Sequence, residues 1–161
     1  MSETSTNIKV VNSISTLGRE EWDECAIFHS DDDANETADP FTCYDFLHAL
    51  EKSGSVGEST GWIPYHLAAF NKNKLVGAVP LYLKSNSQGE YIFDHNWAHA
   101  FERAGGRYYP KLQISVPFTP VTGRRLLVSK NAPDNTAALL LQSAIALCKQ
   151  NNFSSLHTTF C

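Results

Sequence analysis

The residues with the clearest chemical potential lie between Arg103 and Leu127, in the stretch RAGGRYYPKLQISVPFTPVTGRRLL. This stretch holds five basic residues, three glycines and two adjacent tyrosines, and it contains no Asp or Glu. Guanidinium groups bind phosphate and carboxylate through paired hydrogen bonds, and glycines let backbone N–H groups approach an anion closely. We therefore predict an anion-binding site here. The residues assigned to it are Arg103, Gly105, Gly106, Arg107, Tyr108, Tyr109, Lys111, Thr122, Gly123, Arg124 and Arg125.

The distribution of charge leaves two interpretations of these cations open. Residues 1–60 hold 13 acidic and three basic residues, whereas residues 61–161 hold four acidic and ten basic residues. The basic part can attract an anion although the net charge is −4. Alternatively, the arginines are solvated or pair with the acidic part, and the tyrosines belong to the core or its rim. The acidic total and the lack of a recognised motif argue against DNA as a partner.

A second group of reactive side chains, DHNWAHAFE, directly precedes the basic stretch. A carboxylate beside these cations could take the proton of an attacking amine. We assign Asp94 and Glu102 as candidate catalytic residues in that role. His95 and His99 are four residues apart and could share one face of a helix, but the spacing indicates no third ligand, so we predict no metal site.

Hydrophobic periodicity indicates the elements that must position these residues. The expected strands cover residues 8–11, 65–70, 75–83, 90–95, 111–118 and 153–160, and the expected helices cover 17–29, 135–151 and a segment with Thr42 as N-cap. The acidic segment 30–39 is expected to be a loop. For the helix at 135–151, Asp134 is the expected N-cap.

Two of these strands form a predicted β-hairpin, because the segments 65–70 and 75–83 flank the turn signal NKNK. Pro80 inside the second arm indicates an edge position or a bulge. The order of elements predicts an α+β fold, with helices packed on a mostly antiparallel sheet. The last strand would have to pair with residues that this chain does not contain, which predicts an incomplete sheet and allows a homodimer by strand addition.

Length and composition are those of one ordinary domain. At 161 residues and 42% hydrophobic content, the chain can bury a core without disulfides or a metal. The cysteines at 25, 43, 148 and 161 have no paired spacing, which favours free thiols and the cytoplasm. The first residues are too polar for a signal peptide, and no apolar run is long enough to span a membrane.

Longer strings of the sequence are similar to a known family. DPFTCYDFLHALEKSGSVGESTGW, LVGAVPLYLKSNSQGEYIFDHNW and FDHNWAHAFERAGGRYYPKLQISVPFTPVTGRRLLV resemble the FemAB-like N-acyltransferases of the peptidoglycan biosynthesis/recognition type, within the GNAT superfamily. The resemblance runs from about Asp39 to the C-terminus. It implies a GNAT-like fold over residues 1–161 and transfer of an acyl group from an activated donor to an amine.

The resemblance also implies which substrates to expect. The donor would be acyl-CoA or aminoacyl-tRNA, both polyanions, and no tightly bound cofactor is expected. The GNAT pyrophosphate loop has a Gln/Arg-x-x-Gly-x-Gly/Ala pattern, whereas this chain offers only PVTGRR, which weakens acetyl-CoA as donor. Family members are about twice as long, so the chain resembles the N-terminal half of a two-half protein, with the missing half as partner.

Two other readings of the sequence stay open. The chain could be a non-catalytic module that binds an anionic ligand, a cell-wall precursor or a second half. It could also be a complete small acetyltransferase that uses coenzyme A, in which case acetyl-CoA would stabilise it thermally.

Overall fold

The computed structural model describes residues 6–28 and 37–161, and these ranges form four α-helices, two 3-10 turns and ten β-strands. The helices are α1 (Arg19–Ala26), α2 (Tyr44–Lys52), α3 (His95–Arg103) and α4 (Thr136–Gln150), with 3-10 turns at Ile14–Thr16 and Glu58–Thr60. The strands are β1 (Asn7–Val11), β2 (Ile27–Phe28), β3 (Thr37–Ala38), β4 (Trp62–Pro64), β5 (His66–Asn71), β6 (Lys74–Val79), β7 (Leu81–Lys84), β8 (Lys111–Ile114), β9 (Leu127–Val128) and β10 (Leu156–Thr158).

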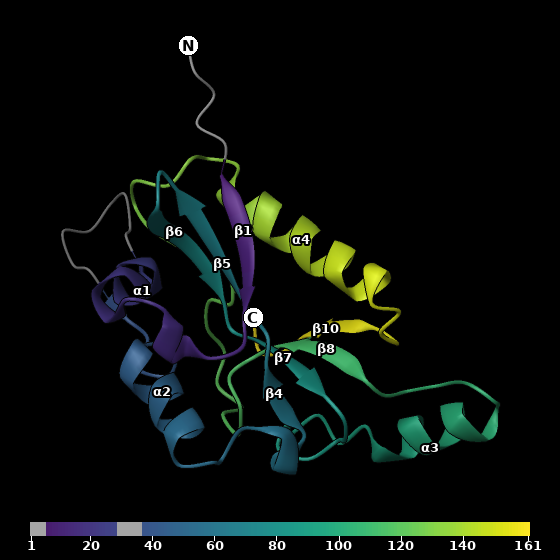
Figure 1. Ribbon diagram of the computed structural model, residues 1–161. Coiled ribbons are helices and arrows are strands. Elements are labelled where there is room, and N and C mark those ends of the chain that lie inside the picture. The colour runs from purple at the N-terminus through teal and green to yellow at the C-terminus, as the bar shows by residue number, and fades with distance from the viewer. Residues whose placement is uncertain (1–5, 29–36) are drawn as a thin grey trace.

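Two four-stranded sheets form the centre of the molecule (Figure 1). The first has the order β1-β5-β6-β9 and is antiparallel throughout. The second has the order β10-β8-β7-β4, and its β8–β10 pair is parallel. The last strand therefore pairs within the chain, and the prediction that its neighbour would be missing was wrong. The short strands β2 and β3 pair separately. The predicted α+β class with a mostly antiparallel sheet is confirmed.

The predicted hairpin forms, but its second arm divides between the two sheets. The turn residues Lys72 and Asn73 have φ values of 48° and 69°, which suits a two-residue hairpin turn. The expected strand 75–83 is interrupted at Pro80, which has no N–H for a ladder. Residues before Pro80 pair in the first sheet as β6, and residues after it pair in the second as β7.

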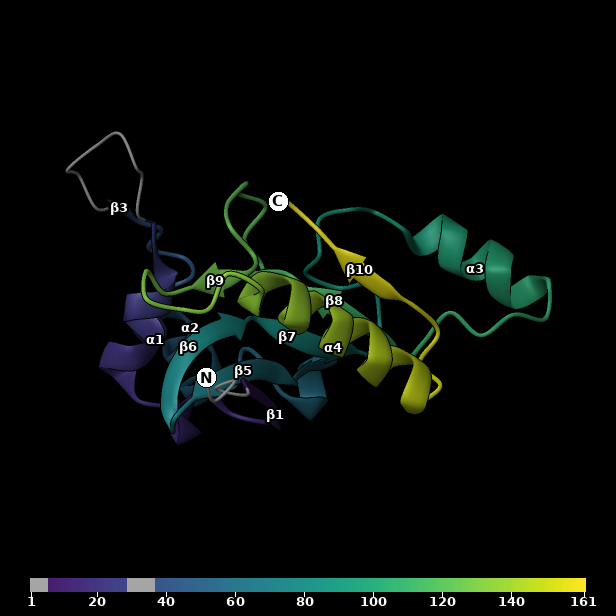
Figure 2. The same cartoon turned by 90° about the horizontal axis from the view of Figure 1, so that it is seen from above.

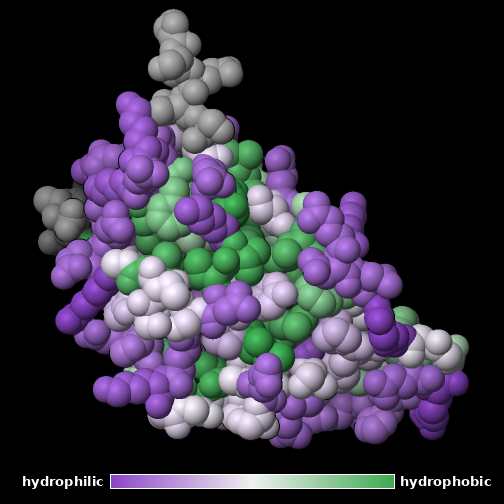
Figure 3. Space-filling model, in the orientation of Figure 1, coloured by the Kyte–Doolittle hydropathy of each residue, from purple (hydrophilic) through white to green (hydrophobic). Residues whose placement is uncertain are grey.

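Helices cover both faces of the first sheet. Trp22 of α1 and Leu47 of α2 pack with Ala68, which β5 presents to one face. Leu140 of α4 packs with the neighbouring Ala69, which β5 presents to the opposite face. Figure 1 shows α1 and α2 on one side of these strands and α4 on the other. Hydrophilic residues cover most of the face in Figure 3, with an apolar band across its middle.

Helix α3 differs from the other three because it stands away from the sheets (Figure 2). The strand expected at 90–95 does not form: Tyr91 and Phe93 have φ values of 57° and 54°, which no strand accommodates, and α3 begins at His95. Among the described residues, none of the helices is long and apolar enough to cross a membrane.

Several predicted boundaries were wrong for local reasons. Helix α1 begins at Arg19 and ends at Ala26, because Ile27 already pairs with Ala38 of β3. The predicted loop 30–39 lies partly outside the described residues, and its end contains β3. The N-caps are Cys43 for α2 and Asn135 for α4, in place of Thr42 and Asp134.

Candidate functional site

The candidate site lies beside the parallel strand pair β8–β10 of the second sheet. Strand β8 lies in the middle of the second sheet and β10 at its edge, and α4 crosses between them along the chain. Leu112 pairs with Leu156, and Gln113 pairs with His157. The basic stretch enters β8 directly, so Tyr108 and its neighbours lie at the start of this strand pair.

Alternating charges lie buried beside this strand pair, and we call them the buried ion-pair chain: Lys84, Glu90, Lys111 and Asp94. Lys111 Nζ lies 2.9 Å from Glu90 Oε2 and 2.8 Å from Asp94 Oδ2. Lys84 Nζ lies 3.9 Å from Glu90 Oε1 and donates a hydrogen bond of 2.9 Å to the carbonyl of Gln88. The side chains of Lys84, Glu90 and Lys111 are fully buried, so each ammonium depends on the neighbouring carboxylate.

At the inner end of the buried ion-pair chain, an ammonium group lies over an aromatic ring. Lys84 Nζ lies 3.8 Å from the centroid of the Trp62 ring, a cation–π contact. Burial lowers the pKa of Lys84 to about 8, although Glu90 opposes the shift. Lys84 therefore keeps its positive charge at neutral pH inside the protein.

The outer end is Asp94, whose Oδ2 accepts a hydrogen bond of 2.7 Å from the hydroxyl of Tyr108. Burial raises the pKa of Asp94, but hydrogen bonds from Lys111, Ser87 and Tyr108 outweigh it and lower the pKa to about 2. A carboxylate with so low a pKa accepts protons poorly at neutral pH. Asp94 is suited to anchoring Tyr108 and Lys111, and this pKa argues against the proton-acceptor role predicted for it.

A pocket of about 230 Å³ opens where α3, Tyr108 and the start of β10 meet. We call it the α3–β10 pocket. Its lining combines aromatic side chains with one cation and one imidazole: Trp97, Phe101, Arg107, Tyr108, Ser154, Ser155 and His157. The aromatic groups Trp97 and Phe101 are 68% and 45% exposed, so a ligand could bury them.

His157 is the titratable group of this pocket whose electrostatics suit proton transfer. Its ring meets the ring of Tyr108 edge-on, with 6.3 Å between centroids. Burial lowers the pKa of His157, the Lys111 cation lowers it further, and Asp94 opposes the shift. The imidazole is therefore neutral at pH 7 and can accept a proton.

The structure gathers part of the predicted anion site around the start of β8. Tyr108, Tyr109 and Lys111 lie together, with the Tyr109 hydroxyl hydrogen-bonded to Ser87. Lys111 is fully buried, and two carboxylates already neutralise it. Arg107 is exposed at the α3–β10 pocket, where its Nη2 donates to the carbonyl of Asn152.

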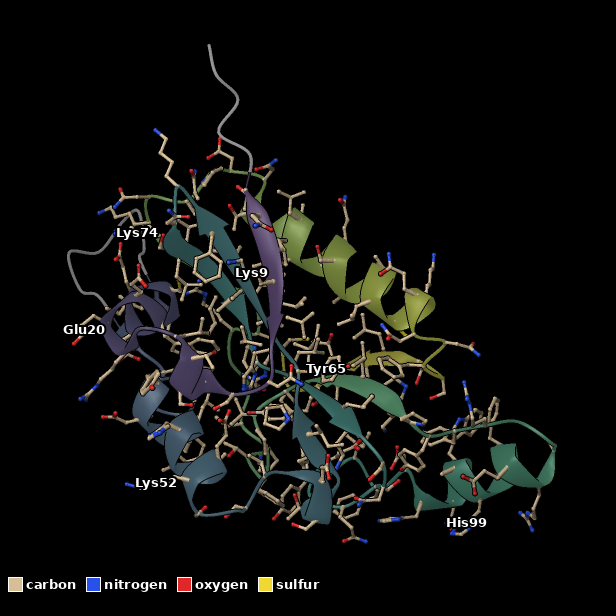
Figure 4. The ribbon with its side chains drawn as sticks, in the orientation of Figure 1. Lys9, Glu20, Lys52, Tyr65, Lys74 and His99 are labelled. Atoms are coloured by element: carbon tan, nitrogen blue, oxygen red, sulfur yellow. The ribbon has the colours of Figure 1, made fainter. Side chains whose placement is uncertain are left out.

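At the end of α3, the two glycines have structural reasons, whereas the two charged residues are exposed. Arg103 and Glu102 are exposed on the last turn of the helix. Gly105 has a φ of +83°, which ends the helix in a left-handed turn. The Cα of Gly106 lies so close to Phe101 that an added Cβ would stand 2.3 Å from the ring. The stick view in Figure 4 labels His99 on this helix, on the side away from the sheets.

Thr122, Gly123, Arg124 and Arg125 form a separate group beside the C-terminal tail. Arg125 is 3% exposed, and its guanidinium donates to the carbonyls of Val121, Arg124 and Thr159. Arg124 donates to the carbonyls of Ile27 and Val128, and the Gly123 N–H donates to the carbonyl of Phe160. Burial lowers the pKa of both arginines. Strand β9 separates this group from α4 along the chain.

Sequence reasoning did not identify His157 as a site residue. It lies in LHT, a segment predicted only as a strand, and a single histidine carries no motif. The parallel pairing of β8 with β10, which puts His157 beside Tyr108, is a long-range contact that local periodicity does not report.

Comparisons with known proteins show the family and the fold of the chain. A sequence model of the FemAB_like family, described as peptidoglycan biosynthesis/recognition, matches residues 13–161. Among curated proteins no match was found.

Two solved structures are similar to the chain. One is a ribosomal-protein-alanine N-acetyltransferase from Brucella melitensis biovar Abortus 2308, with 11% identity and a TM-score of 0.50 over 96% of this chain and 79% of that one. The other is an aminoglycoside acetyltransferase from an uncultured soil metagenomic sample, with 13% identity and a TM-score of 0.47 over 96% of this chain and 79% of that one. At these identities the first likeness shows a shared acetyltransferase fold.

Proposed function

The chain belongs to the FemAB_like family. We propose that it acts as an N-acyltransferase, an enzyme that moves an acyl or aminoacyl group from an activated donor to an amine. The observation that carries the proposal is His157, a neutral imidazole in the α3–β10 pocket of an acetyltransferase-like fold. Acyl transfer to an amine needs such a base, because the attacking nitrogen must lose a proton.

In the proposed reaction the amine nitrogen attacks the carbonyl carbon of the donor, and the new C–N bond forms. His157 takes the proton that the nitrogen loses and returns it to the leaving thiolate or alkoxide. The Tyr108–Asp94 hydrogen bond fixes the ring that His157 packs against.

The proposed donor is anionic, an acyl-CoA or an aminoacyl-tRNA, and it is a substrate that leaves after each turnover. Arg107 is exposed and lines the pocket, and Arg103 is exposed on the last turn of α3, so these two assigned cations are the proposed phosphate contacts. Lys111 and Arg125 are buried against carboxylates or carbonyls, and we now give them supporting functions.

The wider setting of the reaction is also a proposal. The four cysteines are free thiols, which supports a cytoplasmic location. A second half of the protein remains the proposed partner, and β10 at the edge of its sheet is where it would pair. The competing proposal is a non-catalytic module that uses the same pocket for binding only.

The test uses acetyl-CoA as donor and a lysine-containing peptide as acceptor, with the acetylated peptide measured by mass spectrometry. We expect His157→Gln to lower the rate by roughly 100-fold to 10,000-fold and to abolish the fall in rate at acidic pH. The matched control is His99→Gln, which removes an exposed imidazole of α3 and should leave the rate unchanged. An unchanged rate and pH profile in His157→Gln would refute the assignment. Binding of acetyl-CoA without any transfer would favour the non-catalytic module.

A further inference from the structure

A second pocket, of about 350 Å³, opens between the segment that precedes α3 and Phe118, and it takes no part in the proposed reaction. We propose that it binds a pyranose ring, and we call it the aromatic pocket. Its lining includes Ser87, Gln88, Tyr91, Phe93, His95 and Phe118. This inference rests on the proposed function in one respect: the sugar is taken to be part of the larger acceptor molecule that carries the amine.

Three aromatic residues of this pocket share an unusual backbone conformation. Tyr91, Phe93 and Phe118 have φ values of 57°, 54° and 59°, in the left-handed region that bulky residues rarely occupy. Their side chains are nevertheless 49%, 80% and 39% exposed. Strained residues concentrate at functional sites because the strain persists only where the surrounding structure imposes it. Three such residues around one pocket indicate a ring-binding surface.

The floor of the pocket is held rigidly. Gly89 lies so close to the Phe118 ring that an added Cβ would stand 2.5 Å from it, and its carbonyl accepts the N–H of Phe118. The ring of Trp62 lies behind Phe118, with 5.8 Å between centroids, and its Nε1 donates to the carbonyl of Gln88. The aromatic surface is therefore in place before a ligand binds, which lowers the entropy cost of binding.

The chemistry of the lining selects the class of ligand. Among the described residues, no Lys, Arg, Asp or Glu lines the pocket, so a phosphate-bearing ligand would find no charged partner in that lining. A pyranose has C–H groups on its faces, which pack on aromatic rings, and hydroxyls around its edge. Those hydroxyls match the polar side chains of Ser87, Gln88 and His95, which can donate and accept hydrogen bonds.

Ser87 links the aromatic pocket to the buried ion-pair chain. Its hydroxyl is hydrogen-bonded to that of Tyr109, which lies beside Lys111 of the buried ion-pair chain. A sugar in the aromatic pocket would thus lie next to residues that support the α3–β10 pocket. The family description, peptidoglycan biosynthesis/recognition, fits a glycan ligand.

The test is saturation-transfer NMR on the whole chain with two probes, N-acetylglucosamine and adenosine monophosphate. We expect saturation of the sugar ring protons and none for the nucleotide. Phe93→Ala and Tyr91→Ala, each a truncation of an exposed ring, should weaken sugar binding by roughly threefold to tenfold. Leu141→Ala removes a 41% exposed apolar side chain from α4 and should leave sugar binding unchanged.

The outcomes separate this inference from the proposed function. Equal sugar binding by wild type, Phe93→Ala and Tyr91→Ala, no sugar binding at all, or binding of the nucleotide at these residues would overturn the aromatic pocket. If the chain acetylates the peptide but does not bind the sugar, the proposed function is supported and the aromatic pocket as a sugar site is refuted. His157→Gln should retain sugar binding, because His157 does not line the aromatic pocket.

Discussion

At the scale of single residues, Glu51 gathers several polar contacts in one place. Its carboxylate accepts hydrogen bonds from Ser13 Oγ at 2.6 Å and from the N–H of Ile14 at 3.0 Å. It also faces His66 Nε2 at 3.0 Å. Since His66 Nδ1 accepts the N–H of Leu81 at 3.3 Å, the ring proton is on Nε2 and is donated to Glu51.

We expect Glu51→Ala to lower the free energy of unfolding by about 1–3 kcal/mol, because three donors lose their partner in a partly buried site. The measurement is urea unfolding, with Asp45→Ala as control. Asp45 forms an exposed ion pair with Arg19, so its loss should cost only about 0–1 kcal/mol. Equal effects of the two substitutions would contradict the assignment.

The same residue predicts how stability depends on pH. Burial raises the pKa of Glu51, but hydrogen bonds from His66, Ser13 and Ile14 outweigh it, so the pKa lies below its ordinary value. The stabilisation is then present above the unfolded-state pKa of about 4.3 and is lost as pH falls through the folded-state pKa. Unfolding experiments between pH 7 and pH 3 should show this loss in the wild type and a smaller one in Glu51→Ala.

Phe93 allows a direct test of backbone strain. Glycine adopts its φ of 54° without steric cost, whereas alanine does not. We expect Phe93→Gly to be more stable than Phe93→Ala by about 1 kcal/mol in thermal unfolding. The control is Ala100→Gly in α3, where glycine should instead destabilise by about 1 kcal/mol. If glycine is less stable than alanine at position 93 as well as at position 100, the backbone of Phe93 is not strained.

At the scale of elements, α3 is attached to the sheets mainly at its first turn. Asp94, the N-cap of α3, binds Lys111 and Tyr108. We expect Asp94→Asn to accelerate amide hydrogen exchange throughout α3 while exchange in β5 stays slow. Asp134→Asn, in the exposed loop before α4, should change neither. Unchanged exchange in α3 would show that other contacts hold the helix.

The sequence predicted those elements whose signals are local. The turn residues of the hairpin and the apolar repeat of α4 act within a few positions, and both elements form as expected. The change of sheet at Pro80 depends on which strands lie beside it, so local patterns could not reveal it. The candidate site was predicted only in part for the same reason. Lys111 looked like a surface cation because lysines are rarely buried, and its carboxylate partners are fixed only by folding.

For the whole molecule, the open edge of β10 is the feature that bears on assembly. The carbonyl of Ser155 accepts the N–H of Leu112, and the N–H of Thr159 donates to the carbonyl of Ile114. Since alternate residues of a parallel strand bond to its neighbour, the N–H of Thr158 points to the open edge. An unpaired edge can bind a further strand, from a second copy or from another half.

We expect light scattering to show a dimer that dissociates on dilution, because two β10 edges can pair. Thr158→Pro removes the outward N–H, which an edge strand tolerates, and should leave a folded monomer. Thr159→Pro removes the hydrogen bond to Ile114 and should instead cost about 1 kcal/mol of stability. A wild-type chain that stays monomeric at high concentration would refute pairing through this edge.

The pairing of Leu112 with Leu156 has a consequence for the order of folding. Closing so long a loop is slow, whereas the local hairpin β5–β6 can form early. The strand that carries His157 follows all four strands of the first sheet along the chain, so ribosomes deliver it after them. A nascent chain can therefore have its first sheet folded while the α3–β10 pocket does not yet exist, and the proposed activity requires that β10 has been made.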